Sequence, residues 1–248
     1  MRVLMNGLDR LDQREGELDQ RGELDQRGQL DHQAGELSDA ELARLYAPPA
    51  LPWLRVNMVS TIDGSATGSS GRSGSINNEA DGRVFHLLRA MADAIVVGAG
   101  TARAEGYRPT DRPIVLVSRS GGVPELLRGA APGAVLMATV STAEHLAEAR
   151  ELLGPDHVLV LGSHRVSLLE LREHLVARGW TNLLSEGGPH LLRDLVDQGV
   201  ADELTATFVP RLVAGQHPRI TAGPPVDVPL SLRLLLEEDG TLLARWFV

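Results

Sequence analysis

The 248-residue chain predicts an α/β fold, with a central, mostly parallel sheet and an antiparallel hairpin near its C-terminal end. Two observations predict this class. From Pro52 onward, short apolar, β-branched segments alternate with segments whose apolar residues recur at helical spacing. The last two strand-like segments are separated by Asp239-Gly240, a hairpin turn signal. Alternating strands and helices favour parallel pairing, and the hairpin adds an antiparallel edge.

The first 37 residues differ from the rest. The segment Leu18-Asp19-Gln20-Arg21-Gly22-Glu23 recurs with a period of six from Leu24 and again from Leu30. A glycine in each repeat costs about 1 kcal/mol against a helix, and one leucine per repeat cannot build a core. We therefore expect residues 1–37 to be a disordered, low-complexity tail and residues 38–248 to form one domain; a partner-binding arm is the alternative for the tail.

The domain is expected to begin with a short helix over residues 38–50. Ser38-Asp39-Ala40-Glu41 reads as a capping box, and Pro48-Pro49 ends the helix. Further helices are expected over Asn78–Met91, from Ser141 to Gly154, from Ser167 to Gly179 and over Pro189–Gln198. Strands are expected over Leu54–Ser60, Ala94–Gly98, Pro113–Ser118, Ala134–Ala138, His157–Leu161, Asn182–Ser185, Glu203–Val209, Leu232–Glu237 and Thr241–Val248.

Composition excludes several kinds of chemistry. The chain has no cysteine, and all 24 of its basic residues are arginine, so thiolate nucleophiles, lysine Schiff bases and Walker-type phosphate loops are excluded. The eight histidines show no metal-binding spacing, so we expect no metal. A net charge of −9 with 3% aromatic residues argues against nucleic-acid binding. No apolar run is long enough to span a membrane and the N-terminus is polar, so we expect a cytoplasmic protein.

Two glycine-bearing turns follow buried strands and open helices: Gly98-Ala99-Gly100-Thr101 and Glu186-Gly187-Gly188-Pro189. Ligands of α/β sheets bind at the carboxyl ends of strands, where free N–H groups favour phosphate. Either turn alone is equally well explained as a tight strand–helix connection. The two together favour a dinucleotide or another phosphorylated ligand.

Five charged or polar positions are further candidates. Ser118-Arg119 follows a strand and suits a phosphate such as the 2′-phosphate of NADP, although an exposed arginine there is the simpler explanation. Asp63 follows the first strand of the domain, and a turn aspartate explains it equally well. Glu186 could bind donors on a substrate or cap a helix, and Arg89 could contact a phosphate or offset a helix dipole.

These segments, in this order, resemble the reductase domain of bacterial riboflavin biosynthesis, which is similar in fold to dihydrofolate reductase. The resemblance covers about residues 53–247. Its landmarks are Val59-Ser60-Thr61-Ile62-Asp63-Gly64, Leu87-Leu88-Arg89, Ala94–Thr101, Ser185–Leu191, Asp202-Glu203-Leu204 and Val209–Val213.

The resemblance implies a dihydrofolate-reductase-like three-layer sandwich, NADPH as cofactor and a homodimer. The implied reaction is the reduction of 5-amino-6-(5-phosphoribosylamino)uracil to the ribitylamino compound. Asp63 and Glu186 would be catalytic, with Asp63 near the reacting centre and Glu186 anchoring the uracil. The substrate would also contact Ser73, Arg89 and Arg112. The cofactor would contact Val59, Gly98, Gly100, Thr101, Glu105, Ser118, Arg119, Gly187, Gly188, Pro189, His190, Leu191 and Leu192.

Two loops depart from the family pattern. Ser73-Gly74-Ser75-Ile76 lacks the family's tryptophan, and Ala104-Glu105-Gly106-Tyr107-Arg108-Pro109 replaces an Ala-Asp-Asp-Pro-x-Leu-Thr segment. Since these loops touch substrate in the family, a stand-alone paralogue acting on a pterin or folate is an alternative. A non-catalytic nucleotide-binding domain is another, and it would bind NADPH without turnover.

Overall fold

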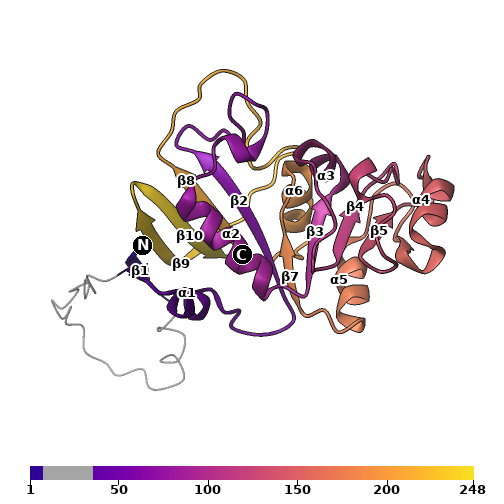
Figure 1. Ribbon diagram of the computed structural model, residues 1–248, viewed down its shortest axis with the longest axis horizontal. Helices are drawn as coiled ribbons and strands as arrows, with labels where there is room; N and C mark the ends of the chain where they lie inside the picture. Colours follow the sequence, from indigo (N-terminus) through magenta and orange to yellow (C-terminus); the bar gives the residue numbers. More distant parts are fainter. Residues whose placement is uncertain (8–35) are drawn as a thin grey trace.

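The computed structural model describes residues 1–7 and 36–248 (Figure 1). Within these residues the strands form one ten-stranded sheet in the order β1-β9-β10-β8-β2-β7-β3-β4-β5-β6. Figure 1 shows β1, β9 and β10 at one end of the molecule and α4 at the other. The sheet therefore runs through the whole described structure, and it confirms the predicted α/β class.

Most of the sheet is parallel, as predicted. The parallel strands are β2 (Trp53–Thr61), β3 (Ala94–Gly98), β4 (Ile114–Val117), β5 (Val135–Thr139), β6 (Val158–Val160), β7 (Asn182–Ser185) and β8 (Glu203–Val209). The expected bounds of β3, β7 and β8 agree with the structure, and those of β2, β4, β5 and β6 differ by one residue at each end. Because these strands point the same way, their carboxyl ends meet at one edge of the sheet.

The antiparallel part also matches the prediction. Strands β9 (Ser231–Glu238) and β10 (Thr241–Phe247) form a hairpin, and β10 pairs with β8. The two turn residues both have positive φ, 48° at Asp239 and 76° at Gly240. Positive φ at both central residues is the geometry that favours Asp-Gly in a two-residue hairpin.

The predicted tail is wrong at its beginning. Residues Arg2–Asn6 form strand β1, which pairs antiparallel with β9 in the register Arg2↔Glu237. Met1 is 7% exposed and packs in the core cluster that includes Leu234 and Leu236 of β9. The leading residues are apolar and find their partner at the far end of the chain, so they belong to the domain. The repeats within residues 8–35 lie outside the described residues.

The helices are α1 (Asp39–Tyr46), α2 (Glu79–Met91), α3 (Ala99–Glu105), α4 (Leu146–Leu153), α5 (Leu168–Ala177) and α6 (Pro189–Asp197), with short 3-10 turns at Ser73–Ser75, Glu125–Leu127 and Pro155–His157. The capping box at Ser38 forms as predicted: its hydroxyl accepts from the Glu41 N–H, and the Glu41 carboxylate accepts from the Ser38 N–H. Helix α4 starts later than expected, because the Ser141 N–H bonds to the carbonyl of Gly162 and residues 141–145 form a turn.

The helices cover both faces of the sheet. Neighbouring residues of β7 show this: Leu183 packs in the core beneath α5 and α6, whereas Leu184 packs beneath α1 and α2. A third cluster fills the space between α3, α4 and strands β3 to β6. The result is a three-layer arrangement, as expected. No helix within residues 1–7 and 36–248 has the length and apolar character needed to cross a membrane.

Candidate active site

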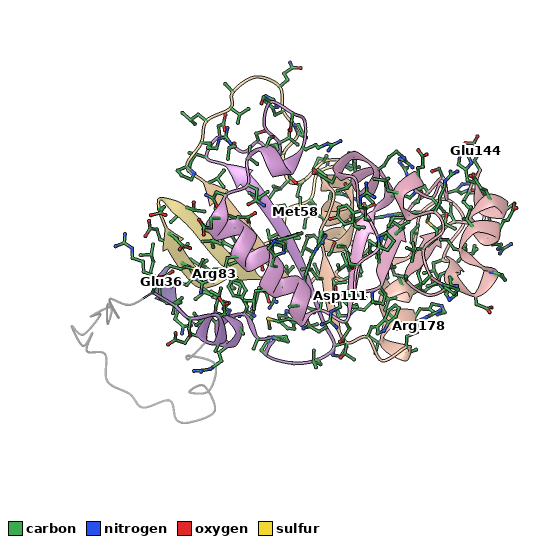
Figure 2. The ribbon with its side chains drawn as sticks, viewed as in Figure 1. Glu36, Met58, Arg83, Asp111, Glu144 and Arg178 are labelled. Carbon is green, nitrogen blue, oxygen red and sulfur yellow. The ribbon has the colours of Figure 1, made fainter. Side chains whose placement is uncertain are left out.

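Two cavities open at the carboxyl edge of the parallel strands. The first has a volume of about 610 Å³, and the second of about 400 Å³. Thr101, Gly188 and Pro189 line both, so the cavities adjoin at the two glycine turns. Figure 2 labels Met58 of β2, which lies near the middle of the molecule and lines the second cavity.

The two glycine turns are in direct contact, as the parallel topology predicts. The Gly98 N–H donates to the carbonyl of Gly187 at 2.8 Å, and the Glu186 N–H donates to Val96 at 3.0 Å. A Cβ on Gly188 would lie 2.1 Å from Thr101 Oγ1, and one on Gly187 would lie 2.8 Å from Met58 Sδ. These distances show that the Gly187-Gly188 turn has no room for side chains, independently of any ligand, whereas a Cβ on Gly98 would make an ordinary contact at 3.5 Å and one on Gly100 would lie in open space.

The first cavity is bounded by the first turns of α3 and α6 and by the segment after β4. Of the expected cofactor residues, Gly98, Gly100, Thr101, Ser118, Arg119, Gly188, Pro189, His190 and Leu191 line it. Arg103 and Arg165 line it too, although the sequence did not single them out. Arg165 is bound to Asp194 and Asp197 at 3.1 and 2.7 Å. Arg119 is exposed, lines this cavity and forms none of the ion pairs found among the described residues.

The second cavity lies beneath one face of α2. Asp81, Phe85 and Arg89, spaced four residues apart, line it from the helix. Asn57, Met58 and Val59 line it from β2, and Ser73, Glu105 and Tyr107 from loops and α3. This cavity therefore combines an apolar wall with acids, one arginine and several hydrogen-bonding groups.

A charged cluster forms one wall of the second cavity. Arg89 donates two hydrogen bonds to Glu186, from Nε at 2.6 Å and from Nη2 at 2.7 Å. The Tyr107 hydroxyl also donates to Glu186, and the Arg89 guanidinium stacks 4.4 Å from the centre of the Phe85 ring. Burial, and then the Glu186 carboxylate, raise the pKa of Tyr107 well above its usual range. Both Glu186 oxygens are therefore bound by protein groups, and a direct contact of this carboxylate with the uracil stays a prediction.

The structure gives Asp63 a different place from the one expected. Its carboxylate accepts from the Thr61 hydroxyl and from the N–H groups of Val213 and Ala214, at 3.1 and 2.7 Å. The Thr61 bond first, and the Ala214 N–H next, lower the pKa of Asp63 to about 2. Asp63 is exposed and is not among the described residues that line either cavity. It fastens one loop to another, and an ionised group of this kind is a poor proton donor.

Three other expected site residues serve the fold. Arg112 lines neither cavity and donates to the carbonyl of Ala90 at 2.7 Å. Leu192 is 1% exposed and packs in the core. Glu105 does line the second cavity, but its carboxylate accepts from the Ser73 N–H at 2.8 Å and so holds the 3-10 turn in place.

Sequence reasoning missed several lining residues. The spacing of Asp81, Phe85 and Arg89 could have indicated a shared helix face, since the helix itself was predicted. Tyr107 and Asn57 carried no such signal. Tyr107 reaches Glu186 from a loop 79 residues away in sequence, and only the sheet topology brings it there.

Comparisons with known proteins agree with this geometry. The family model for the RibD C-terminal domain matches residues 52–240. The chain is 31% identical over 206 residues to the 2,5-diamino-6-ribosylamino-4(3H)-pyrimidinone 5′-phosphate reductase of Methanothermobacter thermautotrophicus, covering 77% of this chain and 94% of that protein. It is 30% identical to the protein of the same name from Archaeoglobus fulgidus, covering 66% and 83% of the two chains.

A solved structure shares the fold. The pyrimidine reductase-like protein of Corynebacterium diphtheriae superposes with a TM-score of 0.72 at 24% identity, covering 86% of this chain and 99% of the other. Family match, curated relatives and fold all agree. The chain therefore belongs to the RibD C-terminal domain family and is an oxidoreductase of the pyrimidine reductase type.

Proposed function

We propose that this protein uses NADPH to reduce 5-amino-6-(5-phosphoribosylamino)uracil, or its 2-amino counterpart, to the ribitylamino product. The observation that carries the proposal is the pair of adjoining cavities, which meet at Thr101, Gly188 and Pro189. The larger, arginine-lined cavity suits a dinucleotide. The smaller one, walled by Arg89, Glu186 and Tyr107, suits a polar heterocycle that carries a phosphorylated sugar.

The residues of the first cavity fit a nicotinamide dinucleotide. The Gly187-Gly188 turn carries no side chain, and the N-terminus of α6 behind it offers free N–H groups to a pyrophosphate. Arg119 and Ser118 would bind the 2′-phosphate that distinguishes NADPH from NADH. When bound, the cofactor supplies a hydride.

The residues of the second cavity orient the acceptor. Arg89 is held in one position by Glu186 and Phe85, so it can direct its remaining N–H groups toward a substrate carbonyl or phosphate without losing conformational entropy. Tyr107, kept protonated, fixes the second oxygen of Glu186. The ring-opened sugar of the substrate is an imine, and its reduction needs a hydride at carbon and a proton at nitrogen.

Two acceptors deserve a direct comparison. The resemblance implies the uracil compound, whereas the curated relatives of M. thermautotrophicus and A. fulgidus are named for the 2,5-diamino-pyrimidinone. Purified protein should oxidise NADPH in the presence of at least one of the two, and dihydrofolate serves as the control acceptor. Turnover of dihydrofolate alone would establish the pterin alternative, and NADPH binding with no turnover would establish the nucleotide-binding alternative.

Cofactor choice is tested separately from turnover. Arg119→Ala should weaken NADPH binding about tenfold or more, the equivalent of a charge-assisted hydrogen bond of roughly 1.5–3 kcal/mol, with little effect on NADH. Binding is measured by titration without acceptor, and Arg178→Ala, an exposed arginine outside both cavities, is the control. Equal weakening of both nucleotides would contradict the assignment. The homodimer stays a prediction, which light scattering tests.

A further inference from the structure

Asp81 is a buried acid that the reduction described above does not yet use. It is the third residue of α2, is 4% exposed and lines the second cavity. Its backbone N–H donates to Asn78 Oδ1 at 3.1 Å, which completes the helix cap and fixes the position of the residue. The side chain is therefore held at the cavity by the start of a helix.

The sheet beneath Asp81 is polar and has unused hydrogen-bonding capacity. Asn57 of β2 pairs with Thr205 of β8 in the sheet. Two residues further along each strand, on the same face, Val59 pairs with Thr207. Within the described part of the chain, Asn57 Oδ1 and Thr207 Oγ1 are buried without a hydrogen-bond partner. Buried polar atoms are almost always bonded, so Asn57 Oδ1 favours a ligand or water in contact with it. Asn57 also lines the second cavity.

Asp81 differs from the other acids that line the second cavity. Glu186 is bound by Arg89 and Tyr107, and Glu105 by the N–H of Ser73. The carboxyl of Asp81 has no such partner among the described residues. Burial raises the pKa of Asp81, and the nearby Thr207 hydroxyl opposes this rise without meeting full hydrogen-bond geometry.

The charged groups on the elements around Asp81 are engaged with one another. Glu203 of β8 binds Arg55 of β2 and Arg245 of β10, each at 2.7 Å, and both guanidinium groups stack on Tyr46 of α1. On α2 itself, Arg83 is paired with Asp39, Arg89 with Glu186, and Glu79 is exposed. These groups leave Asp81 without a cation to stabilise its ionised form.

We propose that Asp81 is the catalytic acid that protonates the substrate nitrogen. The inference rests on the proposed function. As the imine carbon accepts the hydride, the electron pair of the C=N bond moves to nitrogen, and this nitrogen takes the carboxyl proton of Asp81. The carboxylate then regains a proton from water. One substrate, one hydride and one proton thus give the amine, with the proton passing through Asp81.

The test is a single-turnover measurement of NADPH oxidation as a function of pH. For the wild type, the rate should fall as the pH rises through the pKa of Asp81, because only the protonated form donates. Asp81→Asn should lower the rate about 100-fold or more and lose this pH dependence, as expected for removal of a general acid. Asp81→Glu should restore a rate that falls as the pH rises, which we call the falling limb of the pH profile. Dissociation constants for NADPH and substrate should stay within about twofold.

Three further measurements separate catalysis from folding. Glu79→Gln, two residues earlier on the same helix and exposed, should match the wild type. Thr207→Val keeps Asp81 but removes the hydroxyl that favours its ionised form, so the falling limb should move to higher pH. Infrared spectra recorded as a function of pH should contain a protonated carboxyl band that disappears over the same pH range in which the rate falls, and Asp81→Asn should lack this band.

Several outcomes would overturn the role of Asp81. An unchanged rate and pH profile in Asp81→Asn would do so, as would a change in KM alone, which would make Asp81 a ring-binding group. If the rate of Thr207→Val falls at the same pH as that of the wild type, this result would also contradict the role of Asp81. Wild-type protein that reduces no acceptor would instead remove the proposed function, and that result is visible before any variant is made.

Discussion

Arg89 and Glu186 lie 97 residues apart in sequence and are joined by two hydrogen bonds of 2.6 and 2.7 Å. One comes from α2 and the other follows β7, so the pair fastens a helix to a strand end at the wall of the second cavity. The Glu186 side chain is 3% exposed and that of Arg89 is 26% exposed. Removal of either partner leaves a poorly solvated charge, which costs more than an exposed ion pair would.

Glu186→Gln should lower kcat/KM by roughly 5- to 150-fold, equivalent to about 1–3 kcal/mol, because the neutral amide cannot hold both Arg89 and Tyr107. Steady-state kinetics with the phosphoribosylamino-pyrimidine measure this change. Asp39→Asn is the control. It removes the exposed ion pair between Asp39 and Arg83, which lies on the same helix as Arg89, and should have little effect on kcat/KM. Unchanged kinetics in Glu186→Gln would show that the cluster does not orient the substrate.

Gly188→Ala should weaken NADPH binding and lower Tm together. A Cβ at this position would lie 2.1 Å from Thr101 Oγ1 but 3.5 Å from Thr101 Cβ. The conflict is therefore with one hydroxyl of the protein, and Thr101→Ala in the same chain should restore part of Tm. Circular dichroism melts and NADPH titration of the two single variants and the double variant test this. Additive losses in the double variant would contradict the steric explanation.

Asp63→Asn should leave kcat nearly unchanged and should loosen the loop that contains Val213 and Ala214. Trypsin cleavage after Arg211 gives a direct readout, and it should become faster in the variant. The pH dependence follows from the lowered pKa of Asp63: the tether is complete above about pH 4 and is lost as the pH falls toward about 2. Acid should therefore speed cleavage by an acid-stable protease in the wild type and change little in the variant. A large loss of kcat would return Asp63 to the reaction.

Deletion of residues 1–7 should lower Tm by roughly 4–12 °C. The loss of β1 exposes part of the β9 edge and removes Met1 from the core, which costs about 2–3 kcal/mol; a domain of this size loses about 2–4 °C per kcal/mol. Deletion of one hexapeptide, residues 24–29, is the matched control and should leave Tm unchanged. Equal Tm values for all three proteins would show that β1 does not stabilise the domain.

The sequence was most informative where structure is determined locally or by topology alone. Strands β3, β7 and β8 are short buried runs bounded by glycine, proline or polar residues, and their ends could be read directly from the sequence. The contact between Gly98 and Gly187 follows because both turns end parallel strands of one sheet. The residues that determine the strand ends are neighbours in sequence, and the two glycine turns lie at the same carboxyl edge of the sheet.

Long-range partners were invisible from the sequence. Asp63-Gly64 looks like an ordinary turn, and nothing nearby indicates that its carboxylate meets the backbone of residues 213–214. Asp81 looks like any acid in the first turn of a helix, because sequence spacing does not say which face is covered by Asn57 and Thr207. Strand β1 precedes the glycine-containing sequence repeat, and its pairing partner lies more than 200 residues later, near the other end of the given sequence.

The position of β1 also bears on how the protein is made. Arg2–Asn6 is synthesised well before β9, which begins only at Ser231. At ordinary synthesis rates the strand waits roughly 10–50 s for its partner. During this time Val3, Leu4 and Met5 lack the strand with which they pair in the folded domain. The pairing of β1 with β9 is therefore among the last steps of folding. Bulky groups fused to the N-terminus should slow this pairing more than groups fused to the C-terminus.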